Sequence, residues 1–122
     1  MRAQAGWYST SMHAEELHQL DLEIAAPSGD AVTISIQGEL DTTTAPRLIN
    51  AAHDALDGRH DRIELDCDGV WFLDSAGVRA LIVVRNEALG MGVDCEVVRA
   101  SGTVTRILDI TGLTGILTHA AN

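Results

Sequence analysis

The sequence predicts an α/β fold, a single domain in which helices pack on a mixed, mostly parallel sheet of four to five strands. Three observations support this prediction. A chain of 122 residues suffices for one domain with a real core. Short segments with alternating apolar residues, typical of strands, are separated by segments whose apolar residues recur with a helical period. Strand–helix–strand alternation implies right-handed crossovers and therefore parallel strands.

The first part of the domain is expected to be an antiparallel hairpin. Leu22 and Ile24 alternate with charged residues, and residues 32–37 alternate strictly, which is typical of a half-buried strand. Residues 27–30, with the sequence Pro-Ser-Gly-Asp, supply the turn between the two strands.

A helix and a strand are expected to follow the hairpin. The hydroxyls of the three threonines at 42–44 suit a helix cap, and Pro46 suits the first helical turn. This helix ends before Gly58, and its inner face is formed by Leu48, Ala52, Ala55 and Leu56. Residues 63–67 then alternate between apolar and acidic side chains, which predicts a strand.

Residues 68–73 are interpreted as a loop that leads into the second helix. That helix is expected from Ser75 to about Leu89, with glycines at 90 and 92 on either side of its end.

Another strand and helix complete the alternation. Residues 93–97 alternate as a strand does, and Ser101 is placed to cap a helix with apolar residues on one face. Gly112 suits the left-handed conformation that commonly ends a helix. The apolar pair at 116–117 is expected to form a short last strand.

The ends of the chain and its cysteines indicate the compartment. Residues 1–19 are interpreted as a flexible leader, with a weakly signalled helix near 14–20, ahead of the domain at 20–122. No apolar run is long enough to span a membrane, so no membrane insertion is expected, and no secretory signal is evident. Cys67 and Cys95 are isolated in apolar segments, which favours buried free thiols. These observations indicate a cytoplasmic protein.

Composition and charge exclude several classes of function. The net charge is −10, so phosphate backbones repel the chain and nucleic-acid binding is not expected. All 8 basic residues are Arg. The chain therefore has no lysine for a phosphate-binding loop, a Schiff base or a protein-kinase site. Aromatic residues make up only 3% of the chain, so the core must be aliphatic. No metal or cofactor site is expected, because the cysteines lack ligand spacing.

Ser75, at a strand-to-helix junction, is the main candidate for chemistry. A serine there is usually an N-cap, but a helix N-terminus also suits a phosphate group. A serine hydrolase would need the elbow Gly-x-Ser-x-Gly, and Leu73 replaces the first glycine. None of the histidines has the context of a catalytic triad or a metal ligand: His13, His18, His53, His60 and His119. A hydrolase is therefore disfavoured, and the chain is not expected to be an enzyme.

A second loop is expected beside Ser75. The run Gly38-Glu39-Leu40-Asp41 directly follows a strand, and loops at the carboxyl ends of strands commonly form the sites of α/β sheets. The helix after Ser75 is apolar nearly all round, so it is either deeply buried or presents a patch to a partner. These features favour a surface that binds a protein, with Val78 or Leu81 contributing to docking and Asp41 in an exposed loop.

Three stretches resemble the STAS family, in particular the bacterial anti-sigma factor antagonists. Residues 38–41 with Ala45 and Leu48 are similar to the family run G-E-L-D-x-x-x-A-x-x-L. Residues 72–77 with Leu81 are similar to its phosphorylation segment. Val104, Leu108 and Thr111-Gly112-Leu113 are similar to its last helix and the following turn. The family often has Ser or Thr after the acceptor serine, whereas this chain has Ala76.

The resemblance implies that Ser75 is a phosphoacceptor. It implies a partner, an anti-sigma factor with serine-kinase activity, that binds the unphosphorylated protein and is released when Ser75 is phosphorylated. The partner-binding residues are then expected to be Glu39, Asp41, Thr42, Asp74, Ala76, Gly77, Val78 and Leu81. The alternatives left open are a STAS subunit of a transporter or a stress-signalling assembly and, with less support, a small serine hydrolase that uses Ser75.

Overall fold

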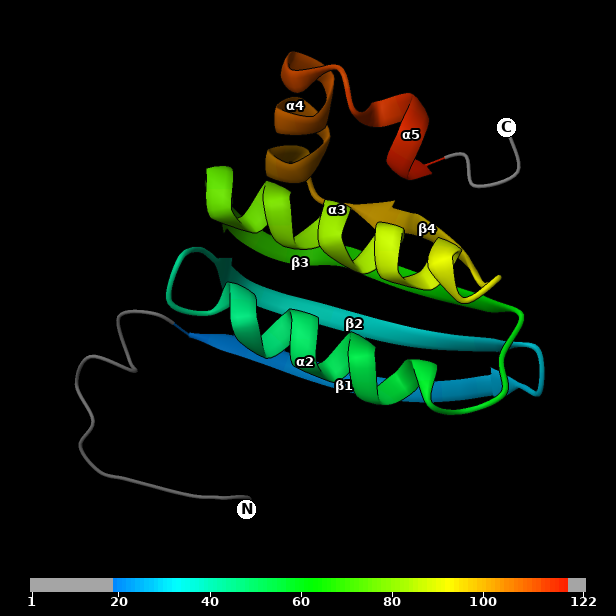
Figure 1. The fold of residues 1–122 in the computed structure, drawn as a ribbon. Coiled ribbons are helices and arrows are strands. Elements are labelled where there is room, and N and C mark those ends of the chain that lie inside the picture. The colour runs from blue at the N-terminus through cyan, green and yellow to red at the C-terminus, as the bar shows by residue number, and fades with distance from the viewer. Residues whose placement is uncertain (1–18, 119–122) are drawn as a thin grey trace, which may run out of the picture.

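The structure, a computed structural model, describes residues 19–118 (Figure 1). Apart from Gln19 and Leu20, the expected leader and the weakly signalled helix near residue 14 lie outside the described residues. In chain order the elements are β1 (Leu20–Ser28), β2 (Ala31–Leu40), α2 (Ala45–Leu56), β3 (Arg62–Leu73), α3 (Ser75–Gly90), β4 (Asp94–Ala100), α4 (Gly102–Thr111) and α5 (Thr114–Thr118). The predicted α/β architecture is confirmed.

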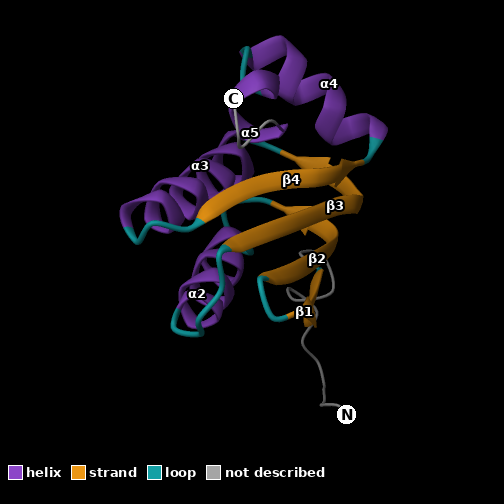
Figure 2. Ribbon diagram, turned by 90° about the vertical axis from the view of Figure 1, so that its right-hand side faces the viewer, coloured by secondary structure: helices purple, strands orange, loops and turns teal. Residues whose placement is uncertain are grey.

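The sheet has four strands in the order β1-β2-β3-β4. β1 pairs antiparallel with β2, so the expected hairpin is confirmed. The β2–β3 and β3–β4 pairs are parallel and are joined through α2 and α3. Crossovers between parallel strands are almost always right-handed, and β2, β3 and β4 are added one after another in the same direction across the sheet. The two crossover helices, α2 and α3, therefore lie on the same face of the sheet. Figure 2 shows this two-layer arrangement.

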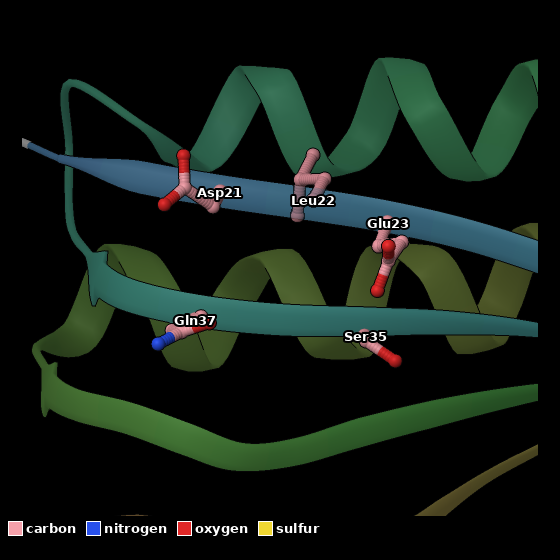
Figure 3. Close-up of a pocket in the computed structure, with 5 residues that line it drawn as sticks. All are labelled: Asp21, Leu22, Glu23, Ser35 and Gln37. Atoms are coloured by element: carbon pink, nitrogen blue, oxygen red, sulfur yellow. The ribbon is translucent and has the colours of Figure 1, made fainter.

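The opposite face of the sheet carries polar side chains. A shallow pocket across β1 and β2 is lined by Asp21, Leu22, Glu23, Ser35 and Gln37 (Figure 3). Further along this face, the Thr33 hydroxyl donates to Glu64 Oε1 over 3.2 Å, and Arg62 Nε lies 2.9 Å from Glu64 Oε2. The two carboxylates of the pocket are exposed, so water solvates them.

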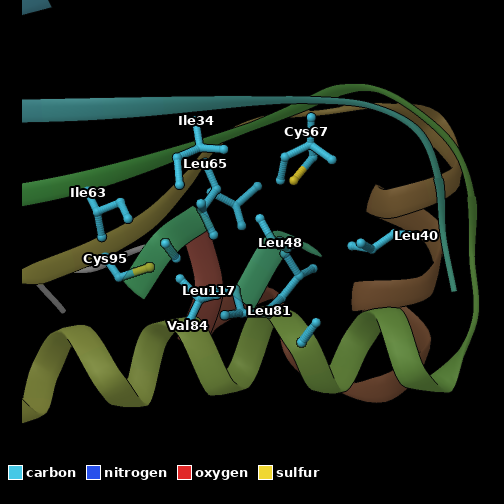
Figure 4. Packing of buried hydrophobic residues seen from close by; sticks show 14 of the residues in the cluster. Ile34, Leu40, Leu48, Ile63, Leu65, Cys67, Leu81, Val84, Cys95 and Leu117 are labelled. Atoms are coloured by element: carbon cyan, nitrogen blue, oxygen red, sulfur yellow. The ribbon is translucent and has the colours of Figure 1, made fainter. Parts of the chain in front are cut away.

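The core between the sheet and the helices is aliphatic (Figure 4). The largest fully buried side chains include Ile34, Ile63, Leu65, Leu81 and Leu108. No aromatic residue occurs among the buried residues that the structure describes. α4 packs against β3, and α5 packs against β4 and α3, so the two helices close the β4 side of the core.

β3 is longer than the sequence predicts. Residues 68–73, interpreted as a loop, continue the strand to Leu73 and pair with the end of β2. Asp68 and Gly69 are typical turn residues, whereas the apolar run that follows them has high strand propensity. Register shifts between β2 and β3 absorb the extra residues, so pairing continues past the turn-like dipeptide.

The last apolar pair is helical, so the sheet has four strands and not five. Residues 116–117 lie in α5, where only Leu117 is buried. Two apolar residues cannot distinguish a helical period from a strand period. The turn before α5 favours the helix, because Gly112 has φ of 75° and the Leu113 N–H donates to Leu108 O over 2.8 Å.

Candidate functional site

The two loops singled out in the sequence meet at the carboxyl ends of β2 and β3. Leu40, the last residue of β2, is the register partner of Leu73, the last residue of β3. The Asp74 N–H then donates to Leu40 O over 3.4 Å. The expected convergence of the two loops is confirmed, and Ser75 begins α3 at this point.

Gly77 brings α3 close to the end of β2. A Cβ built on Gly77 would lie 2.3 Å from Leu40 O and 2.6 Å from Leu73 Cδ1. The Leu73 side chain could move aside, but the backbone oxygen of Leu40 leaves no room for a side chain. Gly77 is buried, so it sets where the helix begins and offers little surface to a partner.

Asp41 lies in the turn between β2 and α2, and the expectation that it is exposed is wrong. Its side chain is 6% exposed. Asp41 Oδ1 accepts hydrogen bonds from the Thr43 N–H over 2.9 Å and the Thr44 N–H over 3.0 Å. The carboxylate therefore closes the turn, as an Asp side chain does when it hydrogen-bonds the backbone two residues on.

Thr44 completes this turn from the other side. Its hydroxyl donates to Glu39 O over 2.6 Å and accepts from the Asp41 N–H over 3.0 Å. Thr44 is the N-cap residue of α2, as expected of this run of threonines, but its side chain makes no capping hydrogen bond. Its hydroxyl instead binds the backbone at the end of β2. Thr42 and Thr43, the other two threonines of the run, are exposed.

Ser75 is the first residue of α3 and not its cap. The N-cap is Asp74, whose Oδ1 accepts from the Gly77 N–H over 3.0 Å. Asp74 is extended at this position and also suits the positive end of the helix dipole. Asp74 makes the capping interaction, so the Ser75 side chain is not needed for it. The exposed Ser75 hydroxyl has no hydrogen bond within residues 19–118.

Val78 and Leu81 do not present an apolar patch. Leu81 is fully buried and Val78 is 9% exposed, because both pack in the core beneath α3. The unusually apolar character of this helix is explained by burial against the sheet on one side, with Ile82 and Val83 only partly exposed on others. The expected docking role of Leu81 therefore does not fit its position.

The sequence-predicted residues that do reach the surface form a small polar group around Ser75. Thr42 and Ser75 are exposed, and Glu39, Asp74 and Ala76 are partly exposed. Arg79 is also exposed, one helical turn after Ser75. Among the described residues, no three His, Cys, Asp or Glu side chains are grouped so as to hold a metal ion.

Sequence reasoning assigned Trp71 and Phe72 to a loop and did not single them out as surface residues. Trp71 is 54% exposed and Phe72 is 47% exposed, at the end of β3 just before Asp74. The signal that could have found them is compositional. The chain contains 2 Trp, 1 Tyr and 1 Phe, and two of these four stand side by side next to the candidate serine.

The cysteines lie inside the sheet, away from solvent. Cys67 and Cys95 are buried and free, as expected. Burial raises the pKa of Cys67 to about 12, with a smaller contribution from the neighbouring Asp66 carboxylate. Burial also raises the pKa of Cys95 to about 12, although Arg85 acts in the opposite direction. Both thiols are therefore held protonated and inert.

The chain belongs to the STAS family: the STAS domain model matches residues 23–122. This range begins within β1 and includes the other three strands, the helices and Ser75 at the start of α3. No curated protein matches the sequence closely enough to add a relative. None of the described helices is both long enough and apolar enough to cross a membrane.

Solved structures with this fold include anti-sigma factor antagonists. One, from Mycobacterium paratuberculosis, is 26% identical, with a TM-score of 0.71 over 81% of this chain and 83% of that one. The antagonist SpoIIAA in its unphosphorylated form is 21% identical, with a TM-score of 0.68 over 84% and 89%. The Bacillus cell fate determinant SpoIIAA in its phosphorylated form is 20% identical, with a TM-score of 0.64 over 84% and 92%. At 20–21% sequence identity, the similarity to the two SpoIIAA structures shows a shared fold and no more.

Proposed function

We propose that this protein is an anti-sigma factor antagonist. It binds an anti-sigma factor that has serine-kinase activity, and phosphorylation of Ser75 by that kinase ends the binding. Unphosphorylated protein holds the kinase and frees a sigma factor. The family membership and the 26% identical antagonist structure support the class of function.

The observation that carries the proposal is the position of Ser75. Its hydroxyl is exposed at the first residue of α3, and the helix cap is made by Asp74. A kinase can therefore modify Ser75 without removing a hydrogen bond that the fold needs. A helix N-terminus also accommodates a phosphate group, typically with a gain of about 0.3–1 kcal/mol, so the fold survives the modification.

The switch follows from the charge that phosphorylation adds. A phosphoserine brings a charge of about −1.5 to −2 to a chain that already carries −10. The partner then meets a dianion where a small hydroxyl had been, beside the Asp74 carboxylate. Desolvating that charge at an interface costs several kcal/mol unless new arginine contacts form. A loss of about 3 kcal/mol corresponds to roughly a hundredfold rise in Kd.

We also propose that the chain acts by binding, without catalysis of its own, in the cytoplasm. A hydrolytic serine needs a base within hydrogen-bond reach. His53, by contrast, lies in the last turn of α2, with its Nδ1 3.5 Å from Glu87 Oε2 near the end of α3, whereas Ser75 begins α3. A fluorophosphonate probe tests this directly, and covalent labelling of Ser75 by the probe would contradict the proposal.

The experiment for the switch begins with the kinase-type anti-sigma factors of the source genome, purified singly. Each is incubated with the protein and MgATP, and modified peptides are mapped by mass spectrometry. We expect one kinase to phosphorylate Ser75. Thr42→Ala is the matched control, since Thr42 is an exposed hydroxyl in the adjoining loop. Label on Thr42, Thr43 or Ser101, with Ser75 unmodified, would contradict the assignment.

Calorimetric titration with that kinase then measures the switch. Ser75→Ala is expected to bind at wild-type affinity and to stay bound in the presence of MgATP. Ser75→Glu and the purified phosphoprotein are expected to bind roughly a hundredfold more weakly. Both should melt near the wild-type temperature. Equal or tighter binding by the phosphoprotein would overturn the switch.

A further inference from the structure

The two aromatic residues at the end of β3, Trp71 and Phe72, lie at the surface. No aromatic residue occurs in the described part of the core. Trp71 and Phe72 are the only aromatic residues within 19–118, and about half of each is exposed. An aromatic side chain can bury about 150–250 Å² and dominates the energetics of whatever surface it enters. Here the buried positions are filled by aliphatic residues, so these two side chains do little for the core.

A β-bulge directs Trp71 outward. The register between β2 and β3 passes from Gly38↔Val70 to Glu39↔Phe72, so Trp71 has no register partner on β2. Val70 and Leu73, on either side of the pair, are 1% and 4% exposed. Bulges of this kind re-aim a side chain and are frequent beside functional sites.

The backbone of the bulge is held by the start of α4. The Ser101 hydroxyl donates to Val70 O over 2.5 Å and accepts from the Val104 N–H over 3.2 Å. The Thr103 hydroxyl reaches Trp71 O over 3.5 Å. The backbone that carries Trp71 is therefore held before any partner arrives, which lowers the ordering cost of binding.

Trp71 lies close enough to Ser75 along the chain for one partner to contact both. Ser75 is four positions after Trp71, which places their Cα atoms at most about 14 Å apart. An ordinary protein interface covers about 800 Å² on each partner, which corresponds to a circle of about 16 Å radius. A partner centred on Ser75 therefore extends far enough to cover Trp71.

We propose that Trp71, with Phe72 beside it, is the apolar anchor by which the kinase docks next to Ser75. The proposal rests on the proposed function, since it takes the Ser75 kinase as the occupant. Tryptophan is enriched among the few residues that carry most of an interface's binding energy.

The charges around the anchor define the chemistry of the partner. Asp68 and Asp74 flank Trp71 along the chain, and Glu39 is the register partner of Phe72. Asp68 is paired with Arg99 Nη2 at 3.1 Å, on the exposed surface. Arg99 thus balances Asp68, and Asp74 and Glu39 remain as the carboxylates near the anchor. The kinase surface should therefore present an apolar pocket whose rim offers hydrogen-bond donors to these two carboxylates, without the free arginines that a phosphoserine would need.

The test compares Trp71→Ala with a matched control. Met91 is also 54% exposed and follows the last residue of α3, about 24 Å from Ser75 at 1.5 Å per residue. Using the kinase that phosphorylates Ser75, we expect Trp71→Ala to raise Kd about 30-fold and Met91→Ala to leave Kd unchanged. Trp71→Phe should recover most of the affinity. Melting curves check that each variant is folded.

A spectroscopic readout reports on Trp71 without removing it. The protein is labelled with 5-fluorotryptophan and carries Trp7→Phe, so that Trp71 gives the only ¹⁹F signal. Adding the unlabelled kinase should shift and broaden that signal, and phosphorylation of Ser75 should restore the signal of free protein. This measurement stands even if Trp71→Ala is unfolded.

The outcomes separate the two proposals. If a kinase phosphorylates Ser75 and binds Trp71→Ala as tightly as wild type, with an unchanged ¹⁹F signal, the anchor is wrong and the proposed function stands. If no kinase binds or modifies the protein, the proposed function fails. If wild type sediments as a dimer and Trp71→Ala as a monomer, the occupant is a second copy and the anchor proposal is overturned.

Discussion

At the scale of single residues, Asp41 shows how an acidic side chain beside a site can belong to the fold. From the sequence it is the last residue of an acidic run after a strand, and nothing local reveals that the turn folds over it. In the structure its carboxylate is buried and accepts two backbone hydrogen bonds. Its effect on partner binding is therefore expected to come through the shape of the loop that carries Thr42.

Asp41→Ala should lower the free energy of unfolding by about 1–3 kcal/mol, because it leaves the Thr44 N–H buried without that acceptor. Asp41→Asn keeps an acceptor oxygen and should cost clearly less. Thr42→Ala, an exposed neighbour, should stay within about 0.5 kcal/mol. Urea denaturation followed by circular dichroism measures all three. An Asp41→Ala variant as stable as Thr42→Ala would show that the turn does not depend on this carboxylate.

At the scale of elements, the sequence located almost every helix and strand because their apolar periods are clear. It placed α3 correctly but could not say which of its apolar residues are buried, since the helix is apolar on most sides. The end of β3 was missed for a different reason. Asp68 and Gly69 are locally turn-like, and only pairing with β2 keeps the chain extended beyond them.

Arg79, one helical turn after Ser75 in α3, is a local partner for a phosphate on Ser75. Arg79 is four residues on and exposed, the spacing at which an acidic group followed by a basic one stabilises a helix by about 0.2–0.5 kcal/mol. We expect Arg79→Ala to destabilise the phosphoprotein by that amount more than the unphosphorylated protein. Arg59→Ala, equally exposed but after α2, should affect both forms alike. Melting curves of wild type and the two variants, each with and without the phosphate, measure the difference. An Arg79→Ala effect that is the same in both forms would contradict the pairing.

At the scale of the whole molecule, the two buried cysteines should control how stability depends on pH in alkaline solution. The chain has no lysine, and its one tyrosine lies outside residues 19–118. Apart from that tyrosine, the side chains that titrate between pH 9 and 12 are the two cysteines. Burial raises the pKa of each from 9.0 to about 12. In that window an unfolded thiol is ionised and a folded one is protonated.

Stability should therefore fall as pH rises above 9, because unfolding releases a proton from each thiol. The slope is up to about 1.4 kcal/mol per pH unit for each cysteine. Chemical denaturation at intervals between pH 8 and 11 measures it. Cys67→Ala combined with Cys95→Ala should lower stability at pH 8 but flatten the alkaline slope. A wild-type protein equally stable at pH 8 and pH 10.5 would contradict the burial of the thiols.

The close contact at Gly77 has a consequence for how such a switch can diversify. At Gly77 the backbone of α3 contacts the end of β2 with no room for a side chain. The backbone around Ser75 therefore tolerates no substitution of Gly77. Trp71 and Thr42 are under no such constraint, since both are exposed at the surface. Duplicated copies can therefore keep one phosphorylation geometry while changing partners, which would insulate parallel signalling pathways from cross-talk within a single cell.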